Sequence, residues 1–205
     1  MNRKTIILLV AMVATILPAV AVADVMVQGS ISVESTVGSP AFFAEQGSNY
    51  AAAQALMPSG TSIWASIHYS STEEIGTLLL PTMTNETLYA VNVLDVNFTS
   101  AINTGNFFIN VTVPTGDAFN AGTYLYFSES SMTFGGISTA TALSSTTTLG
   151  TSSGVYSANL GAAGTYSLEY TGVSSGTVIH VGFETSPNGL GTNPGEASIA
   201  LNYID

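Results

Sequence analysis

Two histidines and thirteen acidic residues are the side chains of this 205-residue chain that could hold a metal ion or transfer protons. His68 and His180 each fall on the polar side of an alternating segment, so they could meet across a β-sheet and bind a metal. Two histidines on separate strands are more often surface residues, and no nucleophile elbow, zinc-protease helix or phosphate loop accompanies them. We therefore expect no enzyme activity, no catalytic residue, no metal and no cofactor.

The carboxylates are spread thinly along the chain, with Glu73-Glu74 as the only adjacent pair. Paired carboxylates could cleave glycosidic bonds, and acidic turns could bind calcium at Asp95-x-Asn97 or in the turn 186–195. No spacing singles out a catalytic pair or a known calcium loop. We interpret the acidic residues as a solvated surface.

Three sequons fall within a short stretch: Asn85-Glu-Thr87, Asn97-Phe-Thr99 and Asn110-Val-Thr112. Such triplets are acceptors for N-linked glycans in exported proteins. Their clustering predicts glycans at Asn85, Asn97 and Asn110, on one side of the molecule.

The only basic residues are Arg3 and Lys4. Recognition of phosphate groups depends on Lys and Arg, so the composition argues against nucleic-acid binding and against attraction to an anionic membrane surface. Cysteine is absent, so an extracellular form of this chain must be stable without disulfide bonds.

Residues 1–23 have the features of a secretory signal peptide that is cleaved on export. A basic start at Asn2-Arg3-Lys4 precedes the apolar run Ile6–Ala14, and Ala21-Val22-Ala23 is a small-residue cleavage site. The mature chain then begins at Asp24, outside the cell and without stable insertion in the membrane, because no second apolar run is long enough to span it. A pilin that keeps its apolar helix is the rival interpretation, and the strand pattern that follows residue 23 disfavours it.

The segment 24–37 begins with a two-residue alternation held for ten residues, with a face of apolar and small residues opposite a mostly polar face. Fully extended, it spans about 45 Å at about 3.3 Å per residue, enough to cross a compact domain about 40 Å wide. It could pair within its own sheet, or it could be donated to a neighbouring subunit. The apolar or small face consists of Val25, Val27, Gly29, Ile31 and Val33.

Residues 38–205 read as strands separated by Gly, Pro and Asn turns, with one short helix over 49–57. Alternation is clearest over 88–98, 106–113, 165–171, 177–184 and 197–203. The Ser/Thr-rich segment 138–154 predicts an exposed loop or an edge ribbon. The pattern indicates an all-β fold, a single jelly-roll-like β-sandwich domain preceded by the donor strand 24–37.

The arrangement of signal, alternating strand and Thr-, Ser-, Gly- and Tyr-rich β-domain resembles archaeal bundling pilus subunits related to the TasA/camelysin family of biofilm matrix fibres. The turn and strand Asn120-Ala-Gly-Thr-Tyr-Leu-Tyr126 is similar to one in that family. The resemblance implies that each subunit lacks one β-element and takes it from the preceding copy, and that the filaments bundle in biofilms. Val25, Val27, Gly29, Ile31 and Val33 would be the donor face.

Two functions therefore follow from the sequence. The first is a secreted structural subunit of a cell-surface filament, a homopolymer formed head to tail by donor-strand complementation, in which the negative charge of the subunits opposes lateral bundling unless salt screens it. The alternative is a secreted β-sandwich adhesin or carbohydrate-binding surface module that does not polymerise. In that case Trp64, Tyr89 and Tyr124 are the aromatic residues available to stack on sugars.

Overall fold

The computed structural model describes most of the chain beyond the segments that the sequence assigns to export and strand donation. The signal peptide 1–23 and the donor residues Val25, Val27, Gly29, Ile31 and Val33 lie outside the described residues. The described ranges are 40–57, 59–81, 85–100, 102–116, 118–143, 147–149, 154–187 and 195–205.

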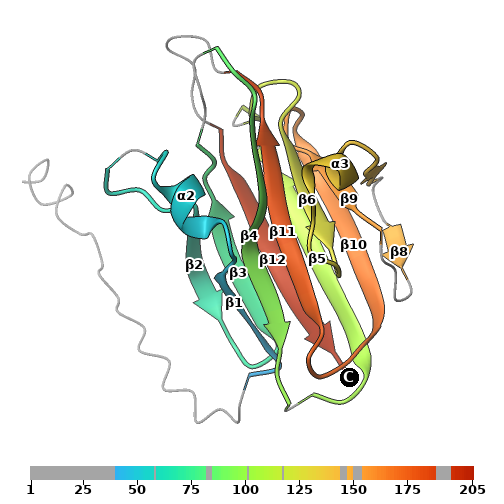
Figure 1. Ribbon diagram of the computed structural model, residues 1–205. Coiled ribbons are helices and arrows are strands. Elements are labelled where there is room, and N and C mark those ends of the chain that lie inside the picture. Colours follow the sequence, from blue (N-terminus) through green and yellow to red (C-terminus); the bar gives the residue numbers. More distant parts are fainter. Residues whose placement is uncertain are drawn as a thin grey trace, which may run out of the picture. The chain divides into compact units, whose positions relative to one another are not determined.

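These residues form two six-stranded sheets that pack face to face (Figure 1). Sheet A has the order β1 (Phe42–Gln46), β4 (Leu88–Phe98), β11 (Val178–Thr185), β6 (Tyr124–Ser128), β9 (Tyr156–Asn159), β7 (Thr141–Ala142). Sheet B has the order β2 (Trp64–Tyr69), β3 (Glu73–Leu78), β12 (Ala197–Ile204), β5 (Gly105–Val113), β10 (Gly164–Val173), β8 (Thr147–Leu149).

The central strands have jelly-roll connectivity. The chain crosses between the sheets at each step from β3 to β6 and passes through the short edge strands β7 in sheet A and β8 in sheet B. It returns to sheet A at β9 and crosses again at each step from β9 to β12. This gives the two four-stranded layers β4-β11-β6-β9 and β3-β12-β5-β10, which is the double Greek key of a jelly roll. The predicted all-β jelly-roll sandwich is confirmed. Four further strands extend the edges of these layers: β1, β2, β7 and β8. Two of them, β7 and β8, lie within the segment 138–154, which the sequence predicted as an exposed loop or an edge ribbon.

Alternating apolar residues build the core as the sequence predicts, because successive side chains of a strand point to opposite faces. In β5 the residues Phe107, Ile109, Val111 and Val113 are buried, and the residues between them are only partly buried. The rings of Phe98 and Phe107 meet edge to face with their centroids 4.8 Å apart. Aromatic and branched side chains from both sheets thus fill one continuous interior.

The pair Glu73-Glu74 departs from the expected solvated surface. The strand β3 starts at Glu73, so the alternation turns Glu74 inward, and only 5% of this residue is exposed. The Nε1–H of Trp64 donates to Glu74 at 3.2 Å, and the backbone N–H of Ala44 donates to its other oxygen at 3.3 Å. The interpretation of Glu74 as a surface residue is therefore wrong, since two neutral donors stabilise its carboxylate inside the sandwich.

Two short helices flank sheet A (Figure 1). The helix α2 (Tyr50–Gln54) lies beside β4 with Tyr50 and Ala53 in the main core, and α3 (Phe134–Ile137) packs on the outer face through Ile137. The first confirms the helix predicted over 49–57, but Asn49 makes no side-chain cap. Its amide instead donates to the carbonyl of Val91 at 2.8 Å and fastens the helix to β4. No helix among the described residues is both long and apolar enough to cross a membrane.

A β-bulge in β4 interrupts the alternation at Asn92. On β11, Val181 pairs with Leu94 and Phe183 with Ala90, so three residues of β4 face Gly182 alone. Asn92 adopts a left-handed conformation with φ of 53°, which asparagine tolerates better than most residues. Its side chain accepts from the N–H of Met132 at 2.8 Å and donates to the carbonyl of the same residue at 3.1 Å. The bulge therefore fixes the segment that leads into α3.

We expect Asn92→Ala to lower the free energy of unfolding by about 2–5 kcal/mol. About 1–2 kcal/mol comes from the left-handed backbone, and about 1–3 from the unpaired N–H of Met132. Asn92→Gly keeps the backbone conformation and loses only the hydrogen bonds, so it should be less damaging. Urea unfolding of the two variants measures the difference, and equal losses would contradict a cost from the left-handed conformation.

Candidate functional site: an aromatic groove and an open sheet edge

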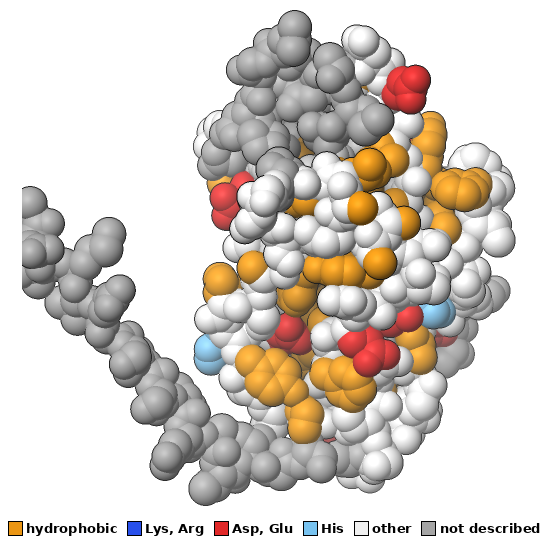
Figure 2. Space-filling model, turned by 60° about the vertical axis from the view of Figure 1, so that its left-hand side comes forward, with side chains coloured by type: hydrophobic (Ala, Val, Ile, Leu, Met, Phe, Trp, Pro, Cys, Tyr) orange, Lys and Arg blue, Asp and Glu red, His pale blue; other side chains and the backbone are white. Residues whose placement is uncertain are grey.

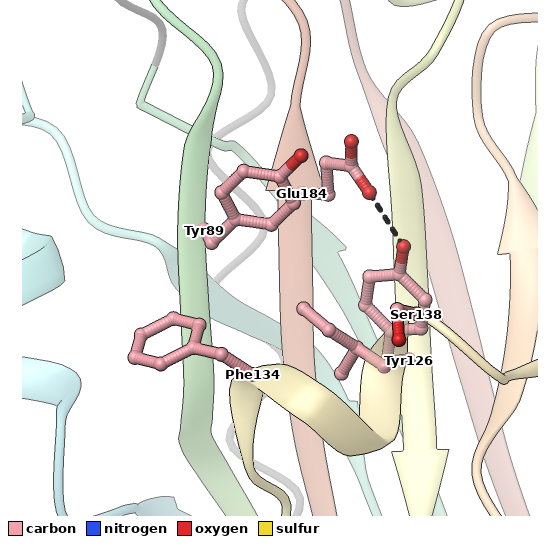
Figure 3. A pocket seen from close by; sticks show the side chains of 6 residues that line it. Tyr89, Tyr126, Phe134, Ser138 and Glu184 are labelled. Atoms are coloured by element: carbon pink, nitrogen blue, oxygen red, sulfur yellow. Dashed lines mark hydrogen bonds between the residues drawn. The ribbon is translucent and has the colours of Figure 1, made fainter.

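A groove of about 480 Å³ lies on the outer face of sheet A beside α3 (Figure 3). The strands β4, β6 and β11 supply its floor, and α3 with the residue after it supplies one wall. Phe134 is 62% exposed and Tyr89 is 45% exposed, whereas Tyr126 is buried. The residues that line the groove are Tyr89, Tyr126, Phe134, Ile137, Ser138 and Glu184.

Glu184 is the charged group of this groove, and tyrosine hydroxyls surround it. It is the cross-strand partner of Tyr89 on β4, and the O–H of Tyr126 donates to its carboxylate at 2.6 Å (Figure 3). Burial and this hydrogen bond raise the pKa of Tyr126, while the hydrogen bond to Glu184 is the main cause that raises the pKa of Tyr89. Both phenols therefore stay protonated at neutral pH, and Tyr126 donates to the carboxylate.

The β4 bulge positions the wall of the groove. Asn92 holds Met132, and the Thr133 hydroxyl accepts the N–H of Gly136 at 3.2 Å as the cap of α3. This cap leaves the first helical residue, Phe134, on the outside. A small apolar cluster, separate from the main core, fixes α3 to the sheet; its buried members are Val91, Tyr126, Met132 and Ile137.

A second hollow of about 250 Å³ continues the groove toward α2. Tyr89 and Phe134 line both hollows, so the two are neighbours along β4. The second hollow is mainly apolar, with Leu56 of the turn after α2 and Leu88 of β4 on its sides and Asn49 as a polar contributor.

The second feature is the edge of sheet B formed by β2. No described strand pairs with its outer side, and all five residues 65–69 are exposed. Ile67 is 68% exposed and Tyr69 48%. The strand contains no Lys and no Pro, two of the devices that commonly protect such an edge from pairing with another chain. Figure 2 shows this side of the molecule, where hydrophobic and acidic side chains are intermixed and the described residues show histidine but no Lys or Arg.

The other three edges are protected. The strands β7 and β8 have only two and three residues, and short edge strands are poor templates. On β1, the backbone N–H groups of Ala41 and Ala44 donate to the carbonyl of Ser71 and to Glu74, and the carbonyl of Phe42 accepts the O–H of Tyr69. Among the described strands, β2 is therefore the long edge left open.

The interior beside this edge is closed. The slot between the sheets, lined by residues such as Ala44, Trp64 and Leu94, has room for only about 10 Å³. This narrow slot favours addition of a further strand at an edge.

The structure does not bring the two histidines together. His68 lies on β2 of sheet B, 3.5 Å from Glu73, and His180 lies on β11 of sheet A, with its Nδ1 2.7 Å from Asp95. The described residues contain no group of three or more His, Asp or Glu side chains that could hold a metal. Asn97, the other half of the calcium candidate, donates to Glu45.

The three sequon asparagines are not on one side of the sandwich, which corrects that expectation. Asn85 is exposed in the connection between β3 and β4, Asn97 faces outward from sheet A, and Asn110 faces outward from sheet B. The Oγ–H of Ser167 donates to Asn110 at 2.7 Å. Of the three, Asn85 is the most accessible to a modifying enzyme.

The predicted aromatic residues divide between core and groove. Trp64 covers the main core and donates to Glu74, so it is not a platform for stacking. Tyr89 lines the groove, and the ring of Tyr124 lies 6.3 Å from that of Tyr126. Sequence reasoning did not identify Phe134 or Glu184. The available signal for Phe134 was a large aromatic residue beside two glycines.

No protein-family model matches the chain, and no curated protein matches it.

The raised pKa of Tyr126 makes the stability of the fold depend on alkaline pH. Above the ordinary tyrosine pKa of 10.0, the unfolded chain releases a proton that the folded chain retains, so stability falls as the pH rises. We expect the stability of Tyr126→Phe to fall less steeply than that of the wild type above about pH 10. At neutral pH the variant should be about 1.5–3 kcal/mol less stable, because it loses a hydrogen bond to a charged group. Chemical denaturation at several pH values tests this, and slopes equal to those of the wild type would contradict it.

Proposed function

We propose that the chain is a structural subunit of an extracellular filament, without enzymatic activity, that polymerises head to tail by donating residues 24–37 to the next copy. The open edge β2 carries the proposal. An unprotected edge strand with exposed apolar side chains is a template for another strand, and the alternating segment 24–37 has the pattern that such a template accepts.

The closed interior favours addition at the edge over insertion into a gap. A strand beside β2 would extend sheet B to seven strands, and its inner face would cover the side of the sandwich near Ala44 and Trp64. Val25, Val27, Ile31 and Val33 match that apolar side, and Gly29 permits close approach. The jelly roll is complete without residues 24–37, so donation leaves the donor subunit folded.

The interactions that an added strand would make with β2 are comparable to or larger than the free-energy cost of association. About six backbone groups of β2 point outward, and their hydrogen bonds contribute roughly 3–9 kcal/mol at about 0.5–1.5 each. Burying four Val or Ile side chains contributes roughly 6–12 kcal/mol. Together these exceed most estimates of the association cost, about 4–15 kcal/mol. Filaments that bundle in a biofilm and carry glycans at Asn85, Asn97 or Asn110 would be the extracellular form.

Saccharide binding is a second candidate function, and the aromatic groove on sheet A favours it. The groove and the open edge lie on different sheets. Binding of a saccharide and polymerisation through β2 are therefore compatible in one molecule.

Deletion of residues 24–34 should abolish filament formation and leave a folded monomer, because the jelly roll does not require these residues. Sedimentation and negative-stain microscopy report the assembly state, and circular dichroism reports the fold. A deleted protein that is unfolded would show instead that the segment pairs within its own subunit.

A charge at the open edge should block assembly without unfolding the subunit. We expect Ile67→Lys to reduce polymerisation strongly, since a lysine at an edge strand opposes pairing. Ile204→Lys is the matched control: its side chain is 58% exposed, but it lies on the internal strand β12. Light scattering during assembly separates the two variants, and equal effects from both would argue against β2 as the acceptor.

A further inference from the structure

The groove on sheet A presents a combination of groups that restricts what can bind in it. Glu184 accepts hydrogen bonds, and the hydroxyls of Tyr89, Tyr126 and Ser138 can donate and accept. Phe134 and Ile137 add apolar surface at the wall formed by α3. The volume of about 480 Å³ lies within the range of small-molecule sites, about 300–1,000 Å³.

Glu184 retains capacity for further partners. An ionised carboxylate offers about four acceptor positions, and the O–H of Tyr126 occupies one of them at 2.6 Å. Tyr89 interacts with the same carboxylate from the neighbouring strand. A ligand can therefore donate two hydrogen bonds to Glu184, while the lone pairs of the phenol oxygens remain available to accept.

Two other kinds of ligand fit these groups less well. A purely apolar segment would bury the carboxylate of Glu184 without new donors, which is costly. A lysine-like cation could pair with Glu184, but it offers no acceptor to a phenol and no ring-sized C–H face to cover Phe134. A ligand rich in hydroxyls, with apolar C–H faces between them, satisfies the carboxylate, the hydroxyls and the exposed ring of Phe134 together.

The length of the surface indicates more than one ring. The hollow of about 250 Å³ beside α2 shares Tyr89 and Phe134 with the main groove, so these two aromatic residues stand at the junction. In Figure 3, Tyr89 and Phe134 border the side opposite Tyr126. A chain of sugar units could place one unit near Glu184 and extend the next past Phe134 over the apolar surface near Leu56.

We propose that this groove binds a neutral oligosaccharide, with Glu184 and the tyrosine hydroxyls as hydrogen-bonding groups and Phe134 as the stacking surface. The inference rests on the second candidate function, saccharide binding, and it is independent of strand donation because it uses no residue of β2 or of segment 24–37. In a filament, the groove would be repeated on every subunit and would give many weak sites a high combined affinity for a polysaccharide.

Titration calorimetry of the protein with neutral tetrasaccharides of glucose, mannose, xylose and N-acetylglucosamine tests the proposal, with tetralysine as the cationic probe. We expect at least one saccharide to bind, and we expect Phe134→Ala and Glu184→Gln each to weaken that binding about ten-fold. Phe134 is highly exposed, so its removal should leave the fold intact. Phe43→Ala is the matched control, because Phe43 is an exposed phenylalanine on β1 outside the groove.

Three results would overturn the proposal. The first is that no saccharide of the panel binds the wild type at millimolar concentration. The second is that Phe43→Ala weakens binding as much as Phe134→Ala does, which would indicate nonspecific contact. The third is that tetralysine alone binds, in a manner that depends on Glu184 and is lost in high salt, which would identify a site for cations.

Discussion

The left-handed residue Asn92 in the middle of β4 is the constraint on which the outer face of sheet A depends. A regular strand would bury its alternate side chains and present a flat face. The bulge instead turns the carbonyls of residues 91–93 toward α2, where Gly47 and Asn49 donate to them. It also turns the Asn92 amide toward the loop before α3. One irregular residue thus positions both helices that border the groove.

Two glycines make that arrangement possible. A Cβ on Gly47 would lie 2.3 Å from the carbonyl oxygen of Asn92, and one on Gly182 would lie 2.8 Å from that of Ala90. Both contacts are with backbone, which cannot move aside without changing the strand. The bulge therefore requires a small residue on each neighbouring segment, and the groove above it is a consequence of backbone packing more than of its own side chains.

Alternation alone predicted the strands whose partners lie on both sides, such as β5, β10, β11 and β12, because a two-residue period fixes which side chains enter a core. The alternation of apolar and polar residues predicted less where a bulge or an edge strand changes which side chains point inward. Glu74 enters the interior since its strand starts earlier than the apolar run, and Trp64 turns inward to meet it. The groove was only partly predictable: Tyr89 was identified, but Glu184 joins it through cross-strand register that the sequence does not state.

The only Lys and Arg of the chain are residues 3 and 4, so the carboxylates of the sandwich cannot form ion pairs with Lys or Arg of the described residues. Neutral hydrogen-bond donors stabilise several of them instead. Carboxylates accept from an indole and a backbone amide at Glu74, from a phenol at Glu184, and from side-chain amides at Glu45 and Glu169. Neutral donors leave the negative charge in place and use only part of the acceptor capacity. Such a surface favours ligands that donate through hydroxyl groups, and it favours contacts between copies that use backbone hydrogen bonds, because neither depends on an opposite charge.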